Sequence, residues 1–445
     1  MQDYRLLLVA YHFPPIAGSG VQRALKLAKY LPKCGLQVHV LTCAHTRYPL
    51  IDDSLLHEID DEPRLRIHRV RGLEPASLAD RVTPQWRRGP LSRAMSALQQ
   101  RVYWRLQSAA DRWATPEPEQ WWIGSAIRAA RRLHATHPFD AILTTSPPHS
   151  MQRVGVDLQR VLQIPWIADL RDPIVDNFAY APKDDITDRY WRSLERDVLD
   201  RADHVVTTCP DYTSRLAEQG AVERLSCITN GYDEADRPAR AALKPREAFT
   251  LSHVGAFYHS QSVAPLLGAC RAFRRRRPDA RLTLRLVGSV SRQQATHFEP
   301  GDDTFTHRIG YQSHTEATRE MAGADALFLM TPSHANGRHC IPAKFFEYLA
   351  FGGRIIALVH RGSSVERIAR TAGGCATAYH DDVESLTYEI ERAYDAHHAQ
   401  SPAVRRDASF VESFRRDRLA TEYADLIASC VREARLTPML GSVAT

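Results

Sequence analysis

Short apolar runs alternate with stretches of helical length along most of this chain, and this alternation limits its possible folds more than any other feature. Buried runs separated by helices are typical of a parallel sheet with helices on both faces. A polar, unpatterned segment at residues 230–249 separates two such series. The first contains RLLLVAY, QVHVLT, LRIHRV, DAILTTS, PWIADL and HVVTTC, and the second FTLSHVGA, LTLRLVG, FTHRIGY, ALFLMTP and RIIALVH. The sequence therefore predicts two α/β domains in tandem.

The length of the chain agrees with this division, because 445 residues are too many for one ordinary core. We place the first domain at residues 1–232 and the second at 247–410. The tail SFVESFRRDRLATEYADLIASCVREA has apolar residues at helical spacing, so we expect a terminal helical segment at 411–436.

Composition excludes several other classes of protein. Hydrophobic content of 44% and charged content of 25% are those of a soluble globular protein. No apolar run approaches the roughly 20 residues of a membrane span, and the run near the start is too short for a signal peptide. The eight cysteines show no metal-ligand spacing, so we expect reduced thiols in a cytoplasmic protein. A net charge of +6 from 58 basic and 52 acidic residues gives no reason to expect a nucleic-acid partner.

The loop Gly18-Ser19-Gly20 follows the first predicted strand and precedes a patterned helix. In a doubly wound domain, this loop borders the ligand crevice. Glycines let the main chain approach a ligand, and free N–H groups at the helix start favour an anion. The pattern also fits a simple tight turn, and it is neither a Walker A motif nor G-x-G-x-x-G.

Two further strands of the first domain end in polar residues. SPPHS contains His149, and DLRDP contains Asp169, Arg171 and Asp172. The carboxyl ends of parallel strands meet at one edge of the sheet, so we expect these groups to line the crevice beside Gly18 to Gly20.

The segment GRHCIPAKFFEYLAFGGRIIALV predicts a short helix, with Pro342 at its start and Gly352 as its C-terminal cap, followed by a buried strand. Lys344 falls in the first turn, where the helix dipole disfavours a cation. A bound phosphate would explain this lysine, and Glu347 one turn later could accept from sugar hydroxyls. An exposed lysine and a capping glutamate are the alternative.

These segments occur in a fixed order along the chain, together with TNGYD, HVGAFY and IGYQSHTEATREMAGADALFLM. Over roughly residues 5 to 430 the set resembles a bacterial family-4 glycosyltransferase with the GT-B fold. The resemblance implies two Rossmann-like domains, with parallel sheets facing a cleft and a C-terminal helix that crosses back to the first domain. It also implies a sugar nucleotide bound mainly by the second domain, an acceptor on the first, transfer with retention of configuration, and no bound metal.

Site residues follow from the same resemblance. Gly18, Ser19 and Gly20 would lie near the diphosphate, Glu347 would hold the ribose, and Gly310-Tyr311-Gln312 would contact the base. His149 would flank the transferred sugar. We add Arg171, Asp172, Asn230, Gly255 and Arg338 as substrate-binding candidates. His149, Asp169 and Lys344 are the catalytic candidates, none with a covalent role, and Asp169 and Asp172 are interpreted as positioning residues.

Two departures from the family pattern stand out. His339 occupies the position of the first glutamate of the Glu–seven residues–Glu motif. The loop VGAFYHSQSVAP lacks the basic pair common in the family, so Lys344 and Arg338 are our candidates for phosphate neutralisation. The leading hypothesis is a metal-independent hexosyltransferase using a UDP- or GDP-linked sugar. A GT-B nucleotide-sugar epimerase and a catalytically silent sugar-nucleotide-binding protein remain alternatives.

Residues 90–113, PLSRAMSALQQRVYWRLQSAADRW, form an amphipathic helical pattern with several arginines on the polar face. Such a helix could rest on an anionic inner-membrane surface, where a lipid-linked acceptor would lie. It could equally pack on its own domain. The expected acceptor is a hydroxyl of a glycan or of a lipid-linked molecule, in polysaccharide or glycolipid assembly.

Overall fold

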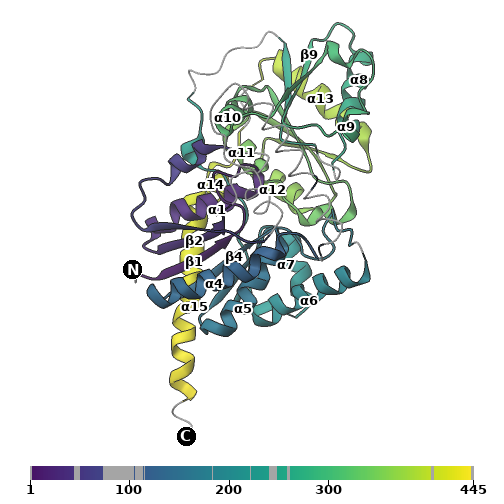
Figure 1. Cartoon of the computed structure of the whole chain (residues 1–445). Helices are drawn as coiled ribbons and strands as arrows, with labels where there is room; N and C mark the ends of the chain where they lie inside the picture. Colours follow the sequence, from purple (N-terminus) through teal and green to yellow (C-terminus); the bar gives the residue numbers. More distant parts are fainter. Residues whose placement is uncertain are drawn as a thin grey trace, which may run out of the picture.

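The computed structural model of the chain describes residues 3–44, 51–73, 105, 114, 116–182, 184–220, 222–239, 248–257, 261–401 and 405–441. Its two parallel sheets lie one above the other in Figure 1, the first below and the second above. This arrangement confirms the predicted pair of Rossmann-like domains. The predicted segment 90–113 lies outside the described residues apart from Arg105, and the domain boundaries at 232, 247 and 410 stay predictions.

The first sheet has seven strands in the order β3-β2-β1-β4-β5-β6-β7. The chain enters at β1 in the middle, builds outward to β3 and then returns to build the other half. Its strands are β1 (Arg5–Ala10), β2 (Gln37–Cys43), β3 (Leu65–Val70), β4 (Ala141–Ser146), β5 (Trp166–Leu170), β6 (His204–Thr207) and β7 (Leu225–Cys227). Its helices are α1 (Ser19–Tyr30), α4 (Gln120–Thr136), α5 (Gln152–Leu162), α6 (Asp185–Arg201) and α7 (Pro210–Ala217).

The second sheet has six strands in the order β10-β9-β8-β11-β12-β13. Every residue of its central strand β8 is buried, as expected for a strand covered on both faces. Its strands are β8 (Phe249–Val254), β9 (Leu282–Val287), β10 (Thr306–Gly310), β11 (Ala326–Met330), β12 (Arg354–Val359) and β13 (Cys375–Tyr379). Its helices are α8 (Ala264–Arg276), α9 (Arg292–Ala295), α10 (His314–Gly323), α11 (Lys344–Phe351), α12 (Ser364–Ala372) and α13 (Val383–His398).

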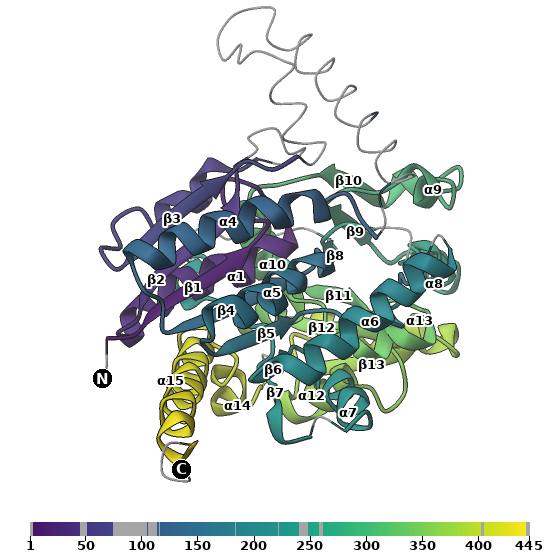
Figure 2. The ribbon, with the colours of Figure 1, turned by 60° about the horizontal axis from the view of Figure 1, so that its bottom comes forward.

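The C-terminal tail forms two helices, α14 (Ala408–Glu412) and α15 (Arg416–Gly441). Helix α15 runs along the first domain and its end extends past that domain (Figure 1). Figure 2 shows α15 beside the amino-terminal strands after a turn of the view. The tail therefore crosses back to the first domain, as predicted. None of the helices in the described ranges combines the length and the apolar character needed to cross a bilayer.

The chain passes between the domains at two places that touch each other, and we call this region the crossing. Tyr232 forms a bridge with Arg415, and the main-chain N–H of Arg416 donates to the carbonyl of Tyr232 at 2.8 Å. Gly231 is needed here, because a Cβ atom at this position would lie 2.0 Å from the carbonyl oxygen of Phe414. The predicted linker is thus ordered at its start, where it includes the 3₁₀ turn Glu234–Asp236.

Helix α11 joins the core of the second domain to the crossing. Phe346 packs on Phe414 with ring centroids 4.8 Å apart, and Phe351 packs on Tyr232 at 5.7 Å. Gly352 caps the helix as predicted, whereas the helix begins at Lys344, two residues after Pro342. Lys344 therefore lies in the first turn, as the sequence indicated.

Candidate active site

The loop before α1 is fixed by the guanidinium group of Arg171. Gly18 caps the helix with a φ of 116°, a conformation that favours glycine. Arg171 donates from Nε to the carbonyl of Ser146 at 2.9 Å, from Nη2 to that of Pro147 at 2.6 Å, and from Nη1 to that of Gly20. Arg171 thus ties the glycine loop to the end of β4. Arg171 therefore has a positioning role, and its predicted role in substrate binding stays a prediction.

Asp169 lies in the interior beneath that loop and is 0% exposed. It accepts hydrogen bonds from Arg23 at 2.9 to 3.1 Å, and from the hydroxyls of Thr145 and Tyr423, each at 2.7 Å. Burial alone would raise the pKa of Asp169, but Arg23 and these hydrogen bonds hold it below its usual value. A fully enclosed carboxylate cannot contact a substrate, so its place among the catalytic candidates is wrong. The alternative interpretation as a positioning residue agrees with these contacts.

His149 begins the 3₁₀ turn that follows β4. Its ring lies edge-on to Trp191 with centroids 6.0 Å apart. Its Nδ1 is buried and has no hydrogen-bond partner among the described residues. Burial, with a smaller contribution from the charge of Arg171, lowers the pKa of His149 to about 3. The imidazole is therefore neutral at pH 7 and can exchange hydrogen bonds with a ligand, but it supplies no positive charge.

The carboxyl ends of β5 and β6 face the loop that follows β11 in the second domain. The thiol of Cys209 donates to the carbonyl of Arg338 at 3.5 Å. Burial and the nearby charge of Asp172 raise the pKa of Cys340 well above its ordinary value. Burial also raises the pKa of the half-buried Asp172 itself, although Arg171 opposes this shift. Asp172 and the neighbours of Arg338 thus meet across the domain boundary, and the Arg338 side chain is exposed there.

His339, which occupies the position of the missing glutamate, lies at the same boundary. Its Nδ1 is buried without a hydrogen-bond partner among the described residues. Burial, followed by the charge of Arg215, lowers the pKa of His339. His339 is therefore neutral at pH 7 and does not replace the charge of a glutamate.

Lys344 projects from the first turn of α11 onto the main chain of Gly255. A Cβ atom at Gly255, where φ is 146°, would lie only 1.8 Å from the Lys344 Nζ. Nζ lies 3.4 Å from the Nε2 of His253, and no carboxylate in the described part of the chain forms an ion pair with it. Burial lowers the pKa of Lys344 to about 8, although Glu347 partly opposes this shift. The structure thus places a partly buried cation, without an ion-pair partner among the described residues, at the carboxyl end of β8.

His253 supports this lysine and was not recognised from the sequence. It is 1% exposed, and its Nδ1 donates to the carbonyl of Phe328 at 3.1 Å, which leaves Nε2 as an acceptor facing Lys344. Burial and the charge of Lys344 lower the pKa of His253 well below its ordinary value. A single histidine inside an apolar strand gives no sequence signal of this role.

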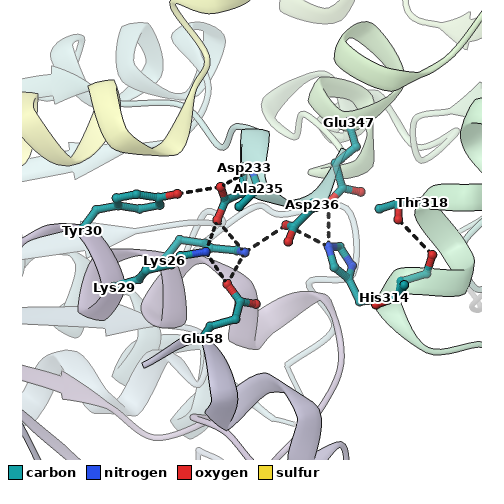
Figure 3. A network of polar contacts seen from close by, with 11 residues as sticks. Lys26, Lys29, Tyr30, Glu58, Asp233, Ala235, Asp236, His314, Thr318 and Glu347 are labelled. Atoms are coloured by element: carbon teal, nitrogen blue, oxygen red, sulfur yellow. Dashed lines mark hydrogen bonds and ion pairs between the residues drawn. The ribbon is translucent and has the colours of Figure 1, made fainter. Parts of the chain in front are cut away.

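Glu347 lies one turn after Lys344, and its carboxylate points toward His314 (Figure 3). The His314 Nε2 lies 3.8 Å from Oε1 of Glu347 and 3.1 Å from Oδ2 of Asp236. Burial raises the pKa of Glu347, whereas His314 favours its ionised form. The sequence could have indicated His314 by the argument used for Lys344, because His314 also occupies the first turn of a helix.

Asp236 continues into a dense polar cluster around Lys26 of α1 (Figure 3). The Lys26 Nζ lies 2.6 Å from Glu58, 2.8 Å from Asp233 and 2.9 Å from Asp236. The three carboxylates are close enough together to suggest a metal site. The ammonium group of Lys26, aided by Lys29, already occupies the central position and balances their charge. We therefore assign no metal to this cluster.

The predicted base-contacting segment leads directly into α10. Gly310 has a φ of 78° and accepts a hydrogen bond from the N–H of Gly288 at 2.8 Å. Tyr311 is 47% exposed, and burial together with Asp52 of the first domain raises its pKa. Gln312 is half-buried beside it, so both side chains are accessible. Asn230 lies instead at the crossing, 3.5 Å from Arg416.

Two facing Rossmann-like domains with a C-terminal helix that returns to the first domain define the GT-B class of fold. Within this class, residues 18–231 match the family described as the glycosyl transferase 4-like domain. This match confirms the resemblance found in the sequence. No curated protein matches the chain.

Solved structures agree with the class of fold over nearly the whole chain. The protein HepE of Anabaena, solved with UDP and glucose, is 12% identical with a TM-score of 0.58, over 98% of this chain and 99% of its own. A glycosyltransferase from Rickettsia africae is 10% identical with a TM-score of 0.61, over 97% and 99%. A putative UDP-N-acetylglucosamine 2-epimerase from Listeria monocytogenes is 12% identical with a TM-score of 0.54, over 97% and 98%. At these identities the likeness shows the fold alone.

Proposed function

We propose that this protein is a retaining, metal-independent glycosyltransferase that moves a hexose from a UDP- or GDP-linked sugar to a hydroxyl acceptor. The glycosyl transferase 4-like domain supports transfer chemistry, and the bound UDP and glucose of HepE support this class of donor. The observation that carries the proposal is the placement of Lys344. A half-buried ammonium group over the main chain of Gly255, with no carboxylate within ion-pair distance among the described residues, is suited to a diphosphate.

The proposed role of each residue follows from its charge and its hydrogen-bonding groups. As the bond from the sugar to the diphosphate breaks, negative charge grows on the leaving group, and Lys344 and the start of α1 stabilise it. Glu347 accepts from the ribose hydroxyls, and Tyr311 and Gln312 contact the base. His149 offers a neutral hydrogen-bonding group to the transferred sugar. Arg171 and Asp169 hold the glycine loop in place, and no side chain forms a covalent bond to the sugar.

The protonation state of Lys344 gives the first test. Its pKa of about 8 means that the ammonium form is lost as the pH rises above 8. Nucleotide affinity should then fall by about tenfold per pH unit above that value, because binding requires uptake of a proton. Calorimetry with UDP and GDP between pH 7 and pH 9.5 measures this slope. Lys344→Arg should remove the slope, because a guanidinium keeps its charge, whereas the exposed Lys33→Ala should keep it.

Turnover gives the second half of the test. Lys344→Ala should lower turnover more than it weakens ground-state binding, since the cation acts most strongly on the transition state. If Lys344→Ala keeps wild-type turnover, Arg338→Ala and the double variant come next. Normal turnover in all three variants would show that phosphate stabilisation comes from elsewhere.

The putative UDP-N-acetylglucosamine 2-epimerase from Listeria monocytogenes supports one alternative, because its fold is similar. An epimerase needs no acceptor, so release of nucleotide that depends on added acceptor excludes it. A silent binding protein, suggested by His339 and the missing basic pair, would bind nucleotide sugars tightly and release nucleotide slowly from all of them.

The acceptor and the location belong to the same proposal. We propose a glycan or lipid-linked acceptor, in polysaccharide or glycolipid assembly, with the protein in the cytoplasm. Contact with the inner membrane surface through residues 90–113 is part of this proposal, and it rests on the amphipathic sequence pattern of that segment alone.

A further inference from the structure

His314 occupies an unusual position for a basic side chain. It is the first residue of α10, where the positive end of the helix dipole disfavours a cation. Two carboxylates approach its Nε2 all the same: Asp236 at 3.1 Å from the crossing and Glu347 at 3.8 Å from α11 (Figure 3). His314 also follows the segment Gly310 to Gln312, with only Ser313 between them. It therefore connects the predicted base contact with the predicted ribose contact.

The charges around this contact come from four elements. Asp236 lies at the domain crossing, Glu347 on α11, Lys26 on α1 and Arg416 at the start of α15. Lys26 is itself bound by Glu58, Asp233 and Asp236. Burial would lower the pKa of His314, but Asp236 and Glu347 raise it above its ordinary value. Without a charge on His314, the carboxylates of Asp236 and Glu347 would repel each other across the site.

We propose that His314 is a positioning residue for the donor, whose imidazolium keeps the Glu347 carboxylate ionised and directed at the ribose. The inference rests on the proposed function, since it assumes that Glu347 holds a ribose. Neutral His314 would remove the group that most favours the ionised form of Glu347, and Glu347 would take up a proton or turn away, whereas Asp236 would keep Lys26 as its partner. The effect should be confined to ligands with a ribose, because the diphosphate is held at Lys344 and not at Glu347.

A double-mutant cycle with two ligands tests this coupling. His314→Gln keeps a hydrogen-bonding side chain but removes the charge, and it should weaken binding of UDP or GDP by about tenfold. Glu347→Gln should weaken the same ligand at least as much. In the Glu347→Gln background, His314→Gln should add almost nothing, because the histidine acts only through the glutamate. Affinity for inorganic pyrophosphate should not change in any of the variants.

Controls separate this role from a general structural one. The matched control is His307→Gln, an exposed histidine of the same domain, which should bind UDP like the wild type. His314→Lys keeps a cation and should recover most of the affinity. Melting temperatures of all variants identify any loss of folding. If His314→Gln does not fold, His314→Lys remains as the variant for comparison with the wild type.

The outcomes distinguish the inference from the proposed function. Additive losses in the cycle, an equal loss of pyrophosphate affinity, or unchanged nucleotide affinity in His314→Gln would overturn the role of His314 and leave the proposed function intact. Unchanged nucleotide affinity in Glu347→Gln, or a wild type that binds neither UDP nor GDP, would overturn the assignment of the ribose site and with it the inference.

Discussion

The side chain of Lys344 lies directly over the main chain of Gly255. The ammonium group lies where any other residue at position 255 would place its Cβ atom, and the φ of 146° is itself unfavourable for such a residue. Gly255→Ala should therefore displace Lys344 and weaken UDP or GDP binding by about tenfold or more, with a lower melting temperature. Calorimetry and thermal unfolding of the purified variant measure both effects.

Gly268→Ala provides the matched control for this substitution. Gly268 lies within α8, and a Cβ atom there would meet nothing within 4 Å. Alanine should raise the stability of the helix by about 0.5–1 kcal/mol and leave nucleotide binding unchanged. Equal nucleotide affinity in the two variants would mean that Lys344 does not need the space above Gly255.

The sequence placed Lys344 correctly in a first helical turn, because that signal is local, and the role of Lys344 stays a prediction. Lys344 was recognised because a cation in a first helical turn needs an explanation from its immediate neighbours. Asp169 was misassigned because the tyrosine that encloses it, Tyr423, lies 254 residues further along the chain. No local pattern could show that a carboxylate at a strand end is sealed by the last helix.

At the scale of elements, the sequence predicted β1 to β6 and β8 to β12 from their apolar runs. It missed β7 and β13, each of which forms one of the two edges of its sheet, whereas the opposite edge strands β3 and β10 were predicted. All three residues of β7 and four of the five in β13 are only half-buried. An edge strand can face solvent, so it needs no continuous apolar run, and its pairing depends on the neighbouring strand.

Strands β2 and β3 meet α4 at a face rich in histidine. The His39 Nδ1 lies 3.0 Å from the His68 Nε2, and the ring of His137 lies 5.5 Å from that of His39. Burial, followed by the charges of His68 and His137, lowers the pKa of His39 to about 4. The unfolded chain binds a proton at this site near pH 6.5 and the folded chain does not, so stability falls as the pH falls from 6.5 toward 4.

We expect His39→Gln to remove part of this acid sensitivity. Between pH 7 and pH 5, the wild type should lose about 2 kcal/mol more unfolding free energy than the variant. Urea denaturation at both pH values measures the difference. His57→Gln, whose side chain is 80% exposed, should behave like the wild type. An equal loss in the wild type and His39→Gln would show that His39 is protonated in the folded protein.

At the scale of the whole molecule, α15 connects the end of the chain to the interior of the first domain. The hydroxyl of Tyr423 donates to Asp169 and accepts from Arg23, and the ring is 1% exposed. Tyr423→Phe keeps the ring and removes only these bonds, which should cost about 1–3 kcal/mol and lower the melting temperature by a few degrees. Tyr388→Phe, at a residue that is 56% exposed, is the control. An unchanged melting temperature in Tyr423→Phe would show that Arg23 and Thr145 suffice for Asp169.

The same tyrosine sets an order of events during synthesis. The strands of the first sheet end at Cys227, yet the ion pair between Arg23 and Asp169 remains open on one side until residue 423 arrives. Nearly the whole second domain must leave the ribosome before that side closes. A nascent chain that stops earlier therefore exposes a charged pair inside an otherwise finished sheet. The first domain is therefore translated first, but it is completed only after nearly all of the second domain has been made.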